Sequence, residues 1–502
     1  MIDKIKSLAK DTAIYGTFRI VGKMLSFLLT PLYTNYILQQ SDFAFINFIF
    51  PLIAIVNVIY SLGLEASFFR FFKSDDVSQS KKAFSNAYIG IAFVSFSFTI
   101  LVQLFARDIA YEVNLLLSDK VSIPLSLEKM TVLIRVAALI PFLDSLLWVP
   151  YAYLRMIRKA KKFATVQFSM IVIAVLLNVV FLIVFKLGSL GVLYAQVIAT
   201  IIGFVLLRKE VIGNLIMKLD RPLMKEMLIF GLPVMVANLP AMLLQVFDRI
   251  LMPYLKVSNA QLNNYSVNYK LGIPMMLIVS MFEYAWKPFF LSHYKDSEAK
   301  ELFSRVFTYF TMLSVVVFLI VGFFMMFIVR MPFVGGKFIN PIYWDGMVII
   351  PIILGGYFFN GAITNFSAGF YITKKTKYIA ITMWTAAIAN IILNIYLIPI
   401  YGYIGAAWAT FIAYLIGAFV AYFLNNRVYK LDYEWKRISL LVGFAMLCYF
   451  PTDYLLKSVD NLYLNFGIKC AVLIIFMVLL KVFGFFTASE LREIKKFFGK
   501  KH

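Results

Sequence analysis

Long runs of apolar residues, separated by short polar segments, follow one another along most of the chain. A run of about 17–25 apolar residues is the length that an α-helix needs to cross the hydrocarbon core of a bilayer. The pattern therefore predicts an all-α polytopic membrane protein with about fourteen transmembrane helices. The expected spans are residues 13–37, 43–65, 84–105, 130–152, 164–185, 190–207, 227–250, 263–284, 306–329, 346–371, 378–399, 403–424, 438–455 and 466–485.

The composition agrees with this pattern. Of the 502 residues, 62% are hydrophobic and 15% are charged, whereas the apolar share of a soluble protein is about 45–50%. The net charge of +22 would suggest a nucleic-acid partner for a soluble chain. In a membrane protein the distribution of the charge matters more than its size, so we expect no nucleic-acid partner.

Lysine and arginine alternate between the predicted loops. With the N-terminus inside, the inside segments carry 34 of the 48 basic residues and the outside segments carry 9. Short cytoplasmic loops hold the excess of positive charge in membrane proteins. The imbalance supports the span count and predicts that both termini are cytoplasmic. The other five basic residues fall inside predicted spans: Arg19, Lys23, Arg135, Arg249 and Lys270.

An internal repeat runs through the first twelve spans. Residues 187–203, "LGSLGVLYAQVIATIIG", match residues 401–417, "YGYIGAAWATFIAYLIG", at an offset of 214, and Gly16 matches Gly231 at an offset of 215. The offset predicts two duplicated six-helix lobes, residues 1–213 and 214–430. Because six is even, the lobes share one orientation, and we expect the substrate path between them. Residues 431–502, with two extra helices and a basic cytoplasmic tail, lie outside the repeat.

Motifs for nucleotide-driven or hydrolytic chemistry are lacking in the sequence. "GTFRIVGKM" has the wrong spacing for a phosphate-binding loop, and Met24 stands where serine or threonine is required. His293 and His502 are the only histidines, and neither belongs to a metal or catalytic pattern. We therefore expect no enzyme, no cofactor and no metal, and transport driven by a gradient. Coupling to a proton or to a sodium ion is left open.

Charged residues inside predicted spans are the candidate functional residues. Arg19 and Lys23 are four residues apart and share one face of a helix. A charge at the centre of a membrane helix costs about 2.5–3.5 kcal/mol, so both are expected to face protein or water. Similar cases are Lys270 in the eighth span, Arg135 and Asp144 in the fourth, Asp248 and Arg249 in the seventh, and Glu65 in the second, followed by Arg70.

Two interpretations of these charges compete. In the first interpretation, the charges neutralise one another, for example by pairing of Asp144 or Glu65 with an arginine, because buried charges are normally paired. Alternatively, they line a cavity that binds an anion. For Arg19, Lys23 and Lys270 the second interpretation is favoured, since the sequence offers few acids at matching depth.

Several segments together resemble a known family. They are "LTPLYTNYIL" (29–38), "SLGLEASFFRFF" (61–72), "YLRMIRKAKKFA" (153–164) and "FGLPVMVANL…VFDRILMPYL…NNYSVNYKL" (230–271). The pattern is similar to that of the polysaccharide (Wzx-type) flippases of the multidrug/oligosaccharidyl-lipid/polysaccharide exporter superfamily. The resemblance covers the first twelve spans.

The resemblance implies a fold of two six-helix lobes and a function. The function is to move an undecaprenyl-pyrophosphate-linked oligosaccharide unit from the cytoplasmic to the periplasmic leaflet of a bacterial inner membrane by alternating access. It would serve O-antigen, lipopolysaccharide or capsule synthesis, with a polysaccharide polymerase and a chain-length regulator as partners. The cavity cations would be Arg19, Lys23, Lys270, Arg249 and Arg135. The candidates for coupling or gating would be Asp248, Asp144, Glu65 and Arg70.

Two alternatives stay open. The first is export of cationic drugs by the same fold, which needs an essential buried acid such as Asp144 or Asp248. The absence of an acid inside the first span speaks against it. The second is a membrane glycan polymerase or transferase, for which the carboxylates of residues 107–129 are the richest set outside the membrane.

Overall fold

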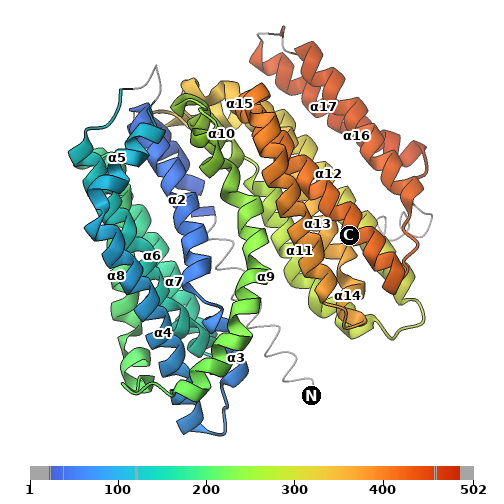
Figure 1. The fold of residues 1–502 in the computed structure, drawn as a ribbon. Helices are drawn as coiled ribbons and strands as arrows, with labels where there is room; N and C mark the ends of the chain where they lie inside the picture. The colour runs from blue at the N-terminus through green and yellow to red at the C-terminus, as the bar shows by residue number, and fades with distance from the viewer. Residues whose placement is uncertain are drawn as a thin grey trace, which may run out of the picture. The chain divides into compact units, whose positions relative to one another are not determined.

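Helices make up nearly all of the computed structural model (Figure 1). It describes residues 22–486 apart from positions 23, 26, 38, 119–122, 457 and 460. Within this part of the chain, eleven helices are long and apolar enough to cross a membrane. The prediction of an all-α, multi-pass membrane protein is therefore confirmed.

The elements follow the predicted spans. Residues 27–36 are helical, and the helices after them are α2 (Gln40–Tyr60), α3 (Leu64–Phe71), α4 (Val77–Leu104), α5 (Ala106–Leu116), α6 (Leu127–Met156), α7 (Ala160–Val179), the π-helical η1 (Val180–Val184), α8 (Ser189–Asn214), α9 (Arg221–Tyr254), α10 (Asn259–Lys270), α11 (Ile273–His293), α12 (Ala299–Arg330), the 3-10 helix η2 (Pro341–Ile349), α13 (Ile350–Phe366), α14 (Ala368–Ile372), α15 (Lys377–Val428), α16 (Trp435–Leu456) and α17 (Leu462–Val482). Two short strands, β1 (Pro332–Phe333) and β2 (Gly336–Lys337), form an antiparallel hairpin before η2.

Predicted spans and observed helices do not always correspond one to one. The 52 residues of α15 would measure about 78 Å, far more than a ~30 Å hydrocarbon core, and the non-helical backbone of Gly402 divides them into the two spans predicted there. The eighth predicted span is broken between α10 and α11. The first predicted span, residues 13–37, begins outside the residues that the structure describes.

The chain forms two compact units. Unit 1 comprises Met1–Lys270, Pro332–Ile349 and Met383–Ala413, and unit 2 comprises Leu271–Met331, Ile350–Thr382 and Tyr414–His502. The lobes expected from the repeat, residues 1–213 and 214–430, remain a prediction.

In unit 1, helix α3 packs directly on α9 through Gly63, which precedes α3, and Gly231 of α9. A Cβ added to Gly231 would lie 2.7 Å from the carbonyl oxygen of Leu62 and 2.8 Å from the hydroxyl of Ser67. The Ser67 hydroxyl donates a hydrogen bond of 2.6 Å to the carbonyl of Met227. Small residues allow this close approach of helix backbones in a membrane. The seam is therefore held by backbone contact and a hydrogen bond.

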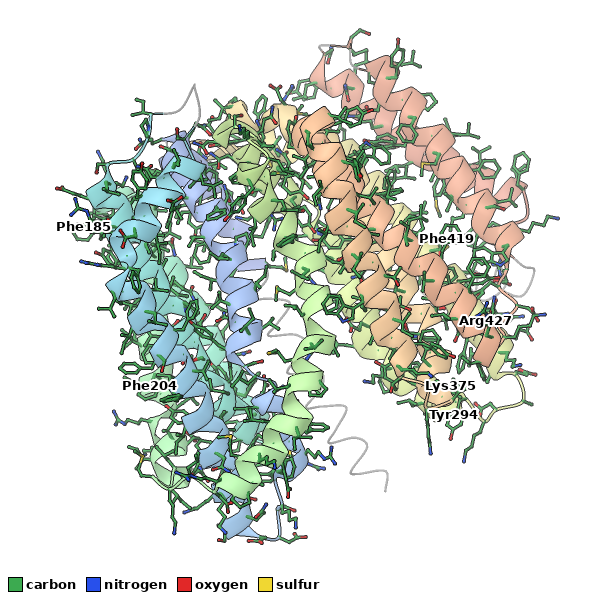
Figure 2. All side chains as sticks on the ribbon, in the orientation of Figure 1. Phe185, Phe204, Tyr294, Lys375, Phe419 and Arg427 are labelled. Atoms are coloured by element: carbon green, nitrogen blue, oxygen red, sulfur yellow. The ribbon has the colours of Figure 1, made fainter. Side chains whose placement is uncertain are left out.

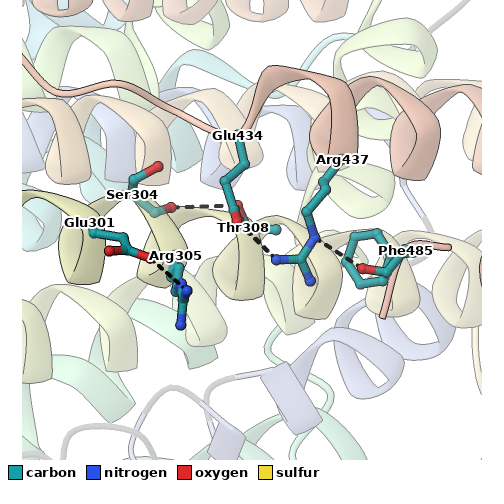
Figure 3. A network of polar contacts seen from close by, with 7 residues as sticks. All are labelled: Glu301, Ser304, Arg305, Thr308, Glu434, Arg437 and Phe485. Atoms are coloured by element: carbon teal, nitrogen blue, oxygen red, sulfur yellow. Dashed lines mark hydrogen bonds and ion pairs between the residues drawn. The ribbon is translucent and has the colours of Figure 1, made fainter. Parts of the chain in front are cut away.

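In unit 2, the two C-terminal helices pack on α12. Leu319 and Phe323 of α12 are buried against Leu441 of α16 and Leu480 of α17. At the start of α16, Glu434 accepts a hydrogen bond of 2.7 Å from Thr308 of α12 and pairs with Arg437 at 3.0 Å (Figure 3). Arg437 in turn donates to the carbonyl of Phe485 at 2.9 Å. The segment outside the sequence repeat is thus an integral part of unit 2.

The repeat extends to backbone geometry. Arg158 and Lys374 both have positive φ, 54° and 59°, at the ends of α6 and α14. The next residues close the same turn, because Lys159 N–H donates to the carbonyl of Leu154 and Lys375 N–H to that of Phe370. Positive φ is uncommon for a residue with a side chain. The same unusual backbone conformation at two positions 216 residues apart supports a duplication of the chain.

Apolar side chains also cover the outer faces of the helices. Phe185 beside η1 and Phe419 on α15 point away from their helices (Figure 2) and are 61% and 55% exposed. In unit 2, Lys375 and Arg427 lie near one end of the helices (Figure 2), and both belong to segments predicted to be cytoplasmic. The exposed apolar side chains are compatible with contact to lipid. The basic residues at one end of the helices agree with the predicted cytoplasmic location of these segments.

Candidate functional site

The strongest polar cluster in unit 1 lies where α9 approaches α10. Asp248 of α9 is buried, with 1% of its surface exposed. One carboxylate oxygen accepts a hydrogen bond from the hydroxyl of Tyr265 on α10, and the other accepts one from the backbone N–H of Arg249 at 2.7 Å. A buried carboxylate is tolerated when donors satisfy its oxygens. Asp248 is therefore held in place.

A second set of buried polar groups stands beside Asp248. Thr410 on α15 is a further hydrogen-bonding neighbour of this carboxylate. The amide of Asn390 lies 3.4 Å from the Thr410 hydroxyl, and the amide of Asn394 donates to the Asn390 side-chain oxygen at 3.0 Å. All three α15 residues are at most 2% exposed. Asp248 thus faces neutral oxygen and amide groups from α15.

Arg249 points toward aromatic rings. Its guanidinium carbon is 4.2 Å from the ring centroid of Tyr269 and 5.6 Å from that of Tyr265. One guanidinium nitrogen also donates to the carbonyl of Gln245 at 3.2 Å. A cation above an aromatic face is stabilised by the ring quadrupole, so α10 supplies a support for this charge.

Lys270 occupies the last position of α10. Its ammonium is 5.7 Å from the ring centroid of Tyr33, and among the described residues no carboxylate lies within 4.0 Å of it. The helix stops here and resumes at Ile273. The carbonyls at a helix C-terminus carry partial negative charge and favour a cation. Broken membrane helices of this kind border the binding sites of many transporters.

Buried amides continue the cluster along α2 and α10. The amide of Asn47 donates to the side-chain oxygen of Asn263 at 2.9 Å. The amide of Asn263 in turn donates to the side-chain oxygen of Gln40 at 2.7 Å. Neither these amides nor Tyr33, Tyr265 and Tyr269 were singled out from the sequence. For Asn263, Tyr265 and Tyr269, the signal was the tyrosine- and asparagine-rich stretch "NNYSVNYK" directly before the break.

The cluster can hold an anion. It contains two cations that interact electrostatically, Arg249 and Lys270, and one carboxylate whose two oxygens already accept hydrogen bonds. Arginine contacts phosphate with two parallel donors, and lysine acts as a point charge. Of the five predicted cavity cations, the structure brings these two together. Arg19 and Lys23 lie outside the described residues.

Glu65 and Arg70 occupy a different place, on α3. Glu65 forms an ion pair with Arg155 near the end of α6, so the carboxylate does neutralise an arginine, but not one of those inside a predicted span. Arg155 also stands 4.7 Å from the ring centroid of Phe69. Arg70 is exposed, with its guanidinium carbon 4.4 Å from the Phe230 ring centroid. Arg155 escaped prediction because it was counted only as loop charge.

Asp144 and Arg135 lie on α6, away from the cluster. Asp144 accepts a hydrogen bond of 3.1 Å from Thr200 on α8. Arg135 is exposed, and its carbonyl accepts a hydrogen bond of 2.9 Å from the side chain of Gln103 on α4. No ion pair joins Arg135 to Asp144 in the described chain. The roles predicted for both residues remain predictions.

Comparisons with solved structures place the fold. The structure of the lipid II flippase MurJ in an inward closed conformation is similar with a TM-score of 0.72 and 17% identity, over 95% of this chain and 99% of that chain. An inward-facing transporter of the multidrug resistance MATE family, within the MOP superfamily, has a TM-score of 0.61 and 12% identity, over 81% and 94%. At these identities the likeness shows the fold alone.

Comparisons by sequence place the family. An uncharacterized membrane protein of Methanocaldococcus jannaschii is 25% identical over 294 residues, which are 56% of this chain and 54% of that protein. The chain thus matches about half the length of this relative. The family model described as polysaccharide biosynthesis protein matches residues 8–293, more than half of the chain. The chain therefore belongs to the polysaccharide biosynthesis protein family, and its all-helical fold is similar to those of the MurJ and MATE structures.

Proposed function

We propose that this protein is a flippase for an undecaprenyl-pyrophosphate-linked oligosaccharide unit, which it moves from the cytoplasmic to the periplasmic leaflet of a bacterial inner membrane. The movement proceeds by alternating access, is driven by a gradient, and supplies units for a surface polysaccharide. Both termini are cytoplasmic. A polysaccharide polymerase and a chain-length regulator act after it, and no catalytic step occurs on this chain.

The observation that carries the proposal is the position of Lys270. Its ammonium lies at a helix break within the eighth predicted span, in the cluster that contains Arg249, and no carboxylate of the described chain is within ion-pair distance. Charges at membrane depth are costly and mark binding sites and transport paths. Membership of the polysaccharide biosynthesis family supports a sugar-bearing substrate.

A pyrophosphate explains why cations are kept there. Moving such an anion through hydrocarbon without partners costs tens of kcal/mol by Born solvation. Arg249 and Lys270 replace part of its hydration, while Tyr33 and Tyr269 keep the two cations oriented. The polyprenyl tail stays in the bilayer, so only the head group has to be accommodated by polar residues. Binding and release, rather than bond breaking, are then the chemical events.

The proposal is tested by replacing the two cations in a producing strain. Lys270→Gln and Arg249→Gln should each reduce surface polysaccharide at least tenfold at an equal level of protein in the membrane. Lys256→Gln is the matched control, because Lys256 is exposed in the short loop between α9 and α10, and it should leave the amount unchanged. Full polymer from the double variant would contradict the proposal.

A further inference from the structure

Asp144 is a carboxylate inside a membrane-spanning helix, and no cation of the described residues lies within ion-pair distance of it. On α6 itself, the nearest charged residues are Arg135 and Arg155, nine and eleven positions away, or about 14 and 16 Å along the axis. None of the ion pairs in the described chain includes Asp144. An unpaired charge in such surroundings is costly, and binding a proton removes the cost.

Neutral polar groups from two neighbouring helices complete the site. The hydroxyl oxygen of Thr200 on α8 is 3.1 Å from the carboxylate of Asp144 and 3.0 Å from the carbonyl of Gln196. A hydroxyl has one hydrogen, so it satisfies one of these acceptors at a time. The side-chain amide of Asn57 on α2 is also a hydrogen-bonding neighbour of the carboxylate.

Asn57 has a free acceptor. Its side-chain oxygen is buried and has no hydrogen-bond partner in the described chain. Buried acceptors without a donor are uncommon and call for an explanation. The site around Asp144 therefore contains more acceptors than donors, and one added proton would correct the imbalance.

Among the residues that the structure describes, the helices packed around Asp144 present no charge that would take the place of this proton. Tyr151 on α6 is the titratable group that faces the carboxylate. On α2 and α8 the facing groups are the neutral Asn57 and Thr200, and Arg208 lies eight residues beyond Thr200, about 12 Å along the axis. The other charged groups on elements packed against α6 stand toward the ends of those elements or on α3 and α5: Lys81, Lys82, Glu65, Arg70, Arg107, Asp108, Glu112, Lys161, Lys162, Lys209, Glu210 and Asp42.

The other candidates for coupling are already engaged. Both oxygens of Asp248 accept hydrogen bonds, and the carboxylate stands next to Arg249. Glu65 is ion-paired with Arg155. A proton arriving at either group would have to displace an existing donor or cation. No cation of the described chain pairs with Asp144, which makes it the carboxylate best suited to gain and lose a proton.

We propose that Asp144 is the proton-binding residue that couples transport to a proton gradient, an inference that rests on the proposed function. In the charged state the carboxylate accepts from the Thr200 hydroxyl and the Asn57 N–H. In the protonated state the Asn57 amide turns over, and its oxygen accepts from the carboxylic O–H. The four side-chain oxygens of Asp144, Thr200 and Asn57 suffice for a proton, whereas metal cations that prefer oxygen take about six ligands.

The experiment is pH-difference infrared spectroscopy on the full chain in lipid nanodiscs. The wild type should show the carbonyl stretch of a protonated carboxylic acid, present at low pH and lost as pH rises. Asp144→Asn should remove this band, whereas Glu226→Gln, which alters an exposed acid on α9, should keep it. Thr200→Val removes a donor to the charged form, so the midpoint should move up by about one pH unit. A band that persists in Asp144→Asn would overturn the proposal, as would one that responds to sodium at constant pH.

Coupling is measured separately in cells. Surface polysaccharide from the wild type should increase as the external pH falls, Asp144→Glu should retain this dependence, and Asp144→Asn should show none. A normal pH dependence in Asp144→Asn would overturn the coupling role. If Lys270→Gln leaves polymer unchanged while the infrared band behaves as expected, the proposed substrate is wrong and the proton site stands.

Discussion

Gly188 and Gly402, which are 214 positions apart, have the same backbone conformation, with φ of 59° and 58° and ψ of −136° and −138°. Each lies in unit 1 and opens a membrane-spanning helix. A Cβ at Gly188 would lie 2.4 Å from a carboxylate oxygen of Asp42, and one at Gly402 would lie 2.5 Å from the side-chain oxygen of Gln261. Asp42 is on α2 and Gln261 is on α10, the start of the second span in each half of the repeat. The duplication thus preserves the glycine turn together with its contact to the polar side chain of a neighbouring helix.

This turn predicts the effect of alanine. Gly188→Ala and Gly402→Ala should each lower the free energy of unfolding by about 1–3 kcal/mol, because a side chain is strained at this φ and ψ. The melting temperature of the purified protein in detergent measures the change. Gly443→Ala is the control, since Gly443 lies within α16 and an added Cβ would meet nothing within 4 Å. Equal melting temperatures for all three variants would refute the structural role of the turn.

The hydroxyl of Tyr265 is predicted to stabilise the Asp248 carboxylate. Tyr265→Phe removes one donor from a buried charge and should cost about 1.5–3 kcal/mol of stability. Tyr254→Phe alters a tyrosine that is 62% exposed and should be neutral. Thermal unfolding of the two variants, followed in parallel, distinguishes them. A neutral Tyr265→Phe would mean that Asp248 does not depend on this donor.

The ion pair between Glu65 and Arg155 is predicted to contribute little to the free energy of unfolding. Its side chains are 36% and 37% exposed, so solvent screens the attraction. A double-mutant cycle with Glu65→Ala and Arg155→Ala should give a coupling energy of about 0.5–1 kcal/mol. The more exposed pair Glu301–Arg305 should give less. Because Arg155 also covers the Phe69 ring, Arg155→Lys should destabilise more than Arg305→Lys, and the reverse order would contradict this account.

Hydrophobic length predicted most of the helices. The observed helices extend the expected spans at many ends, for example α9 to Arg221–Tyr254 from residues 227–250. Such ends carry polar or charged turns that leave the hydrocarbon, and a search for apolar runs does not detect them. The break after Lys270 was missed for another reason: Leu271 and Gly272 are compatible with a helix, and only packing decides that the helix stops.

The site could be predicted only as a list of charges. The sequence predicted that Asp248, Arg249 and Lys270 lie inside membrane spans. It could not show which side chains of the consecutive helices α9 and α10 face one another, since that depends on packing. It also could not assign partners: Glu65 pairs with Arg155, which had been counted as loop charge. Tyrosines are frequent in this chain, 29 in all, so those beside the cations did not stand out.

The central claim is tested most directly by the leaflet in which the lipid-linked oligosaccharide resides. Inner-membrane vesicles of known orientation, prepared from a strain that makes the unit, can be treated with a membrane-impermeant enzyme or label that modifies its sugar. With the wild-type protein, most units should be accessible from the periplasmic face. With Lys270→Gln or without the protein, units should accumulate on the cytoplasmic face. Equal accessibility from the periplasmic face in all three would contradict the account.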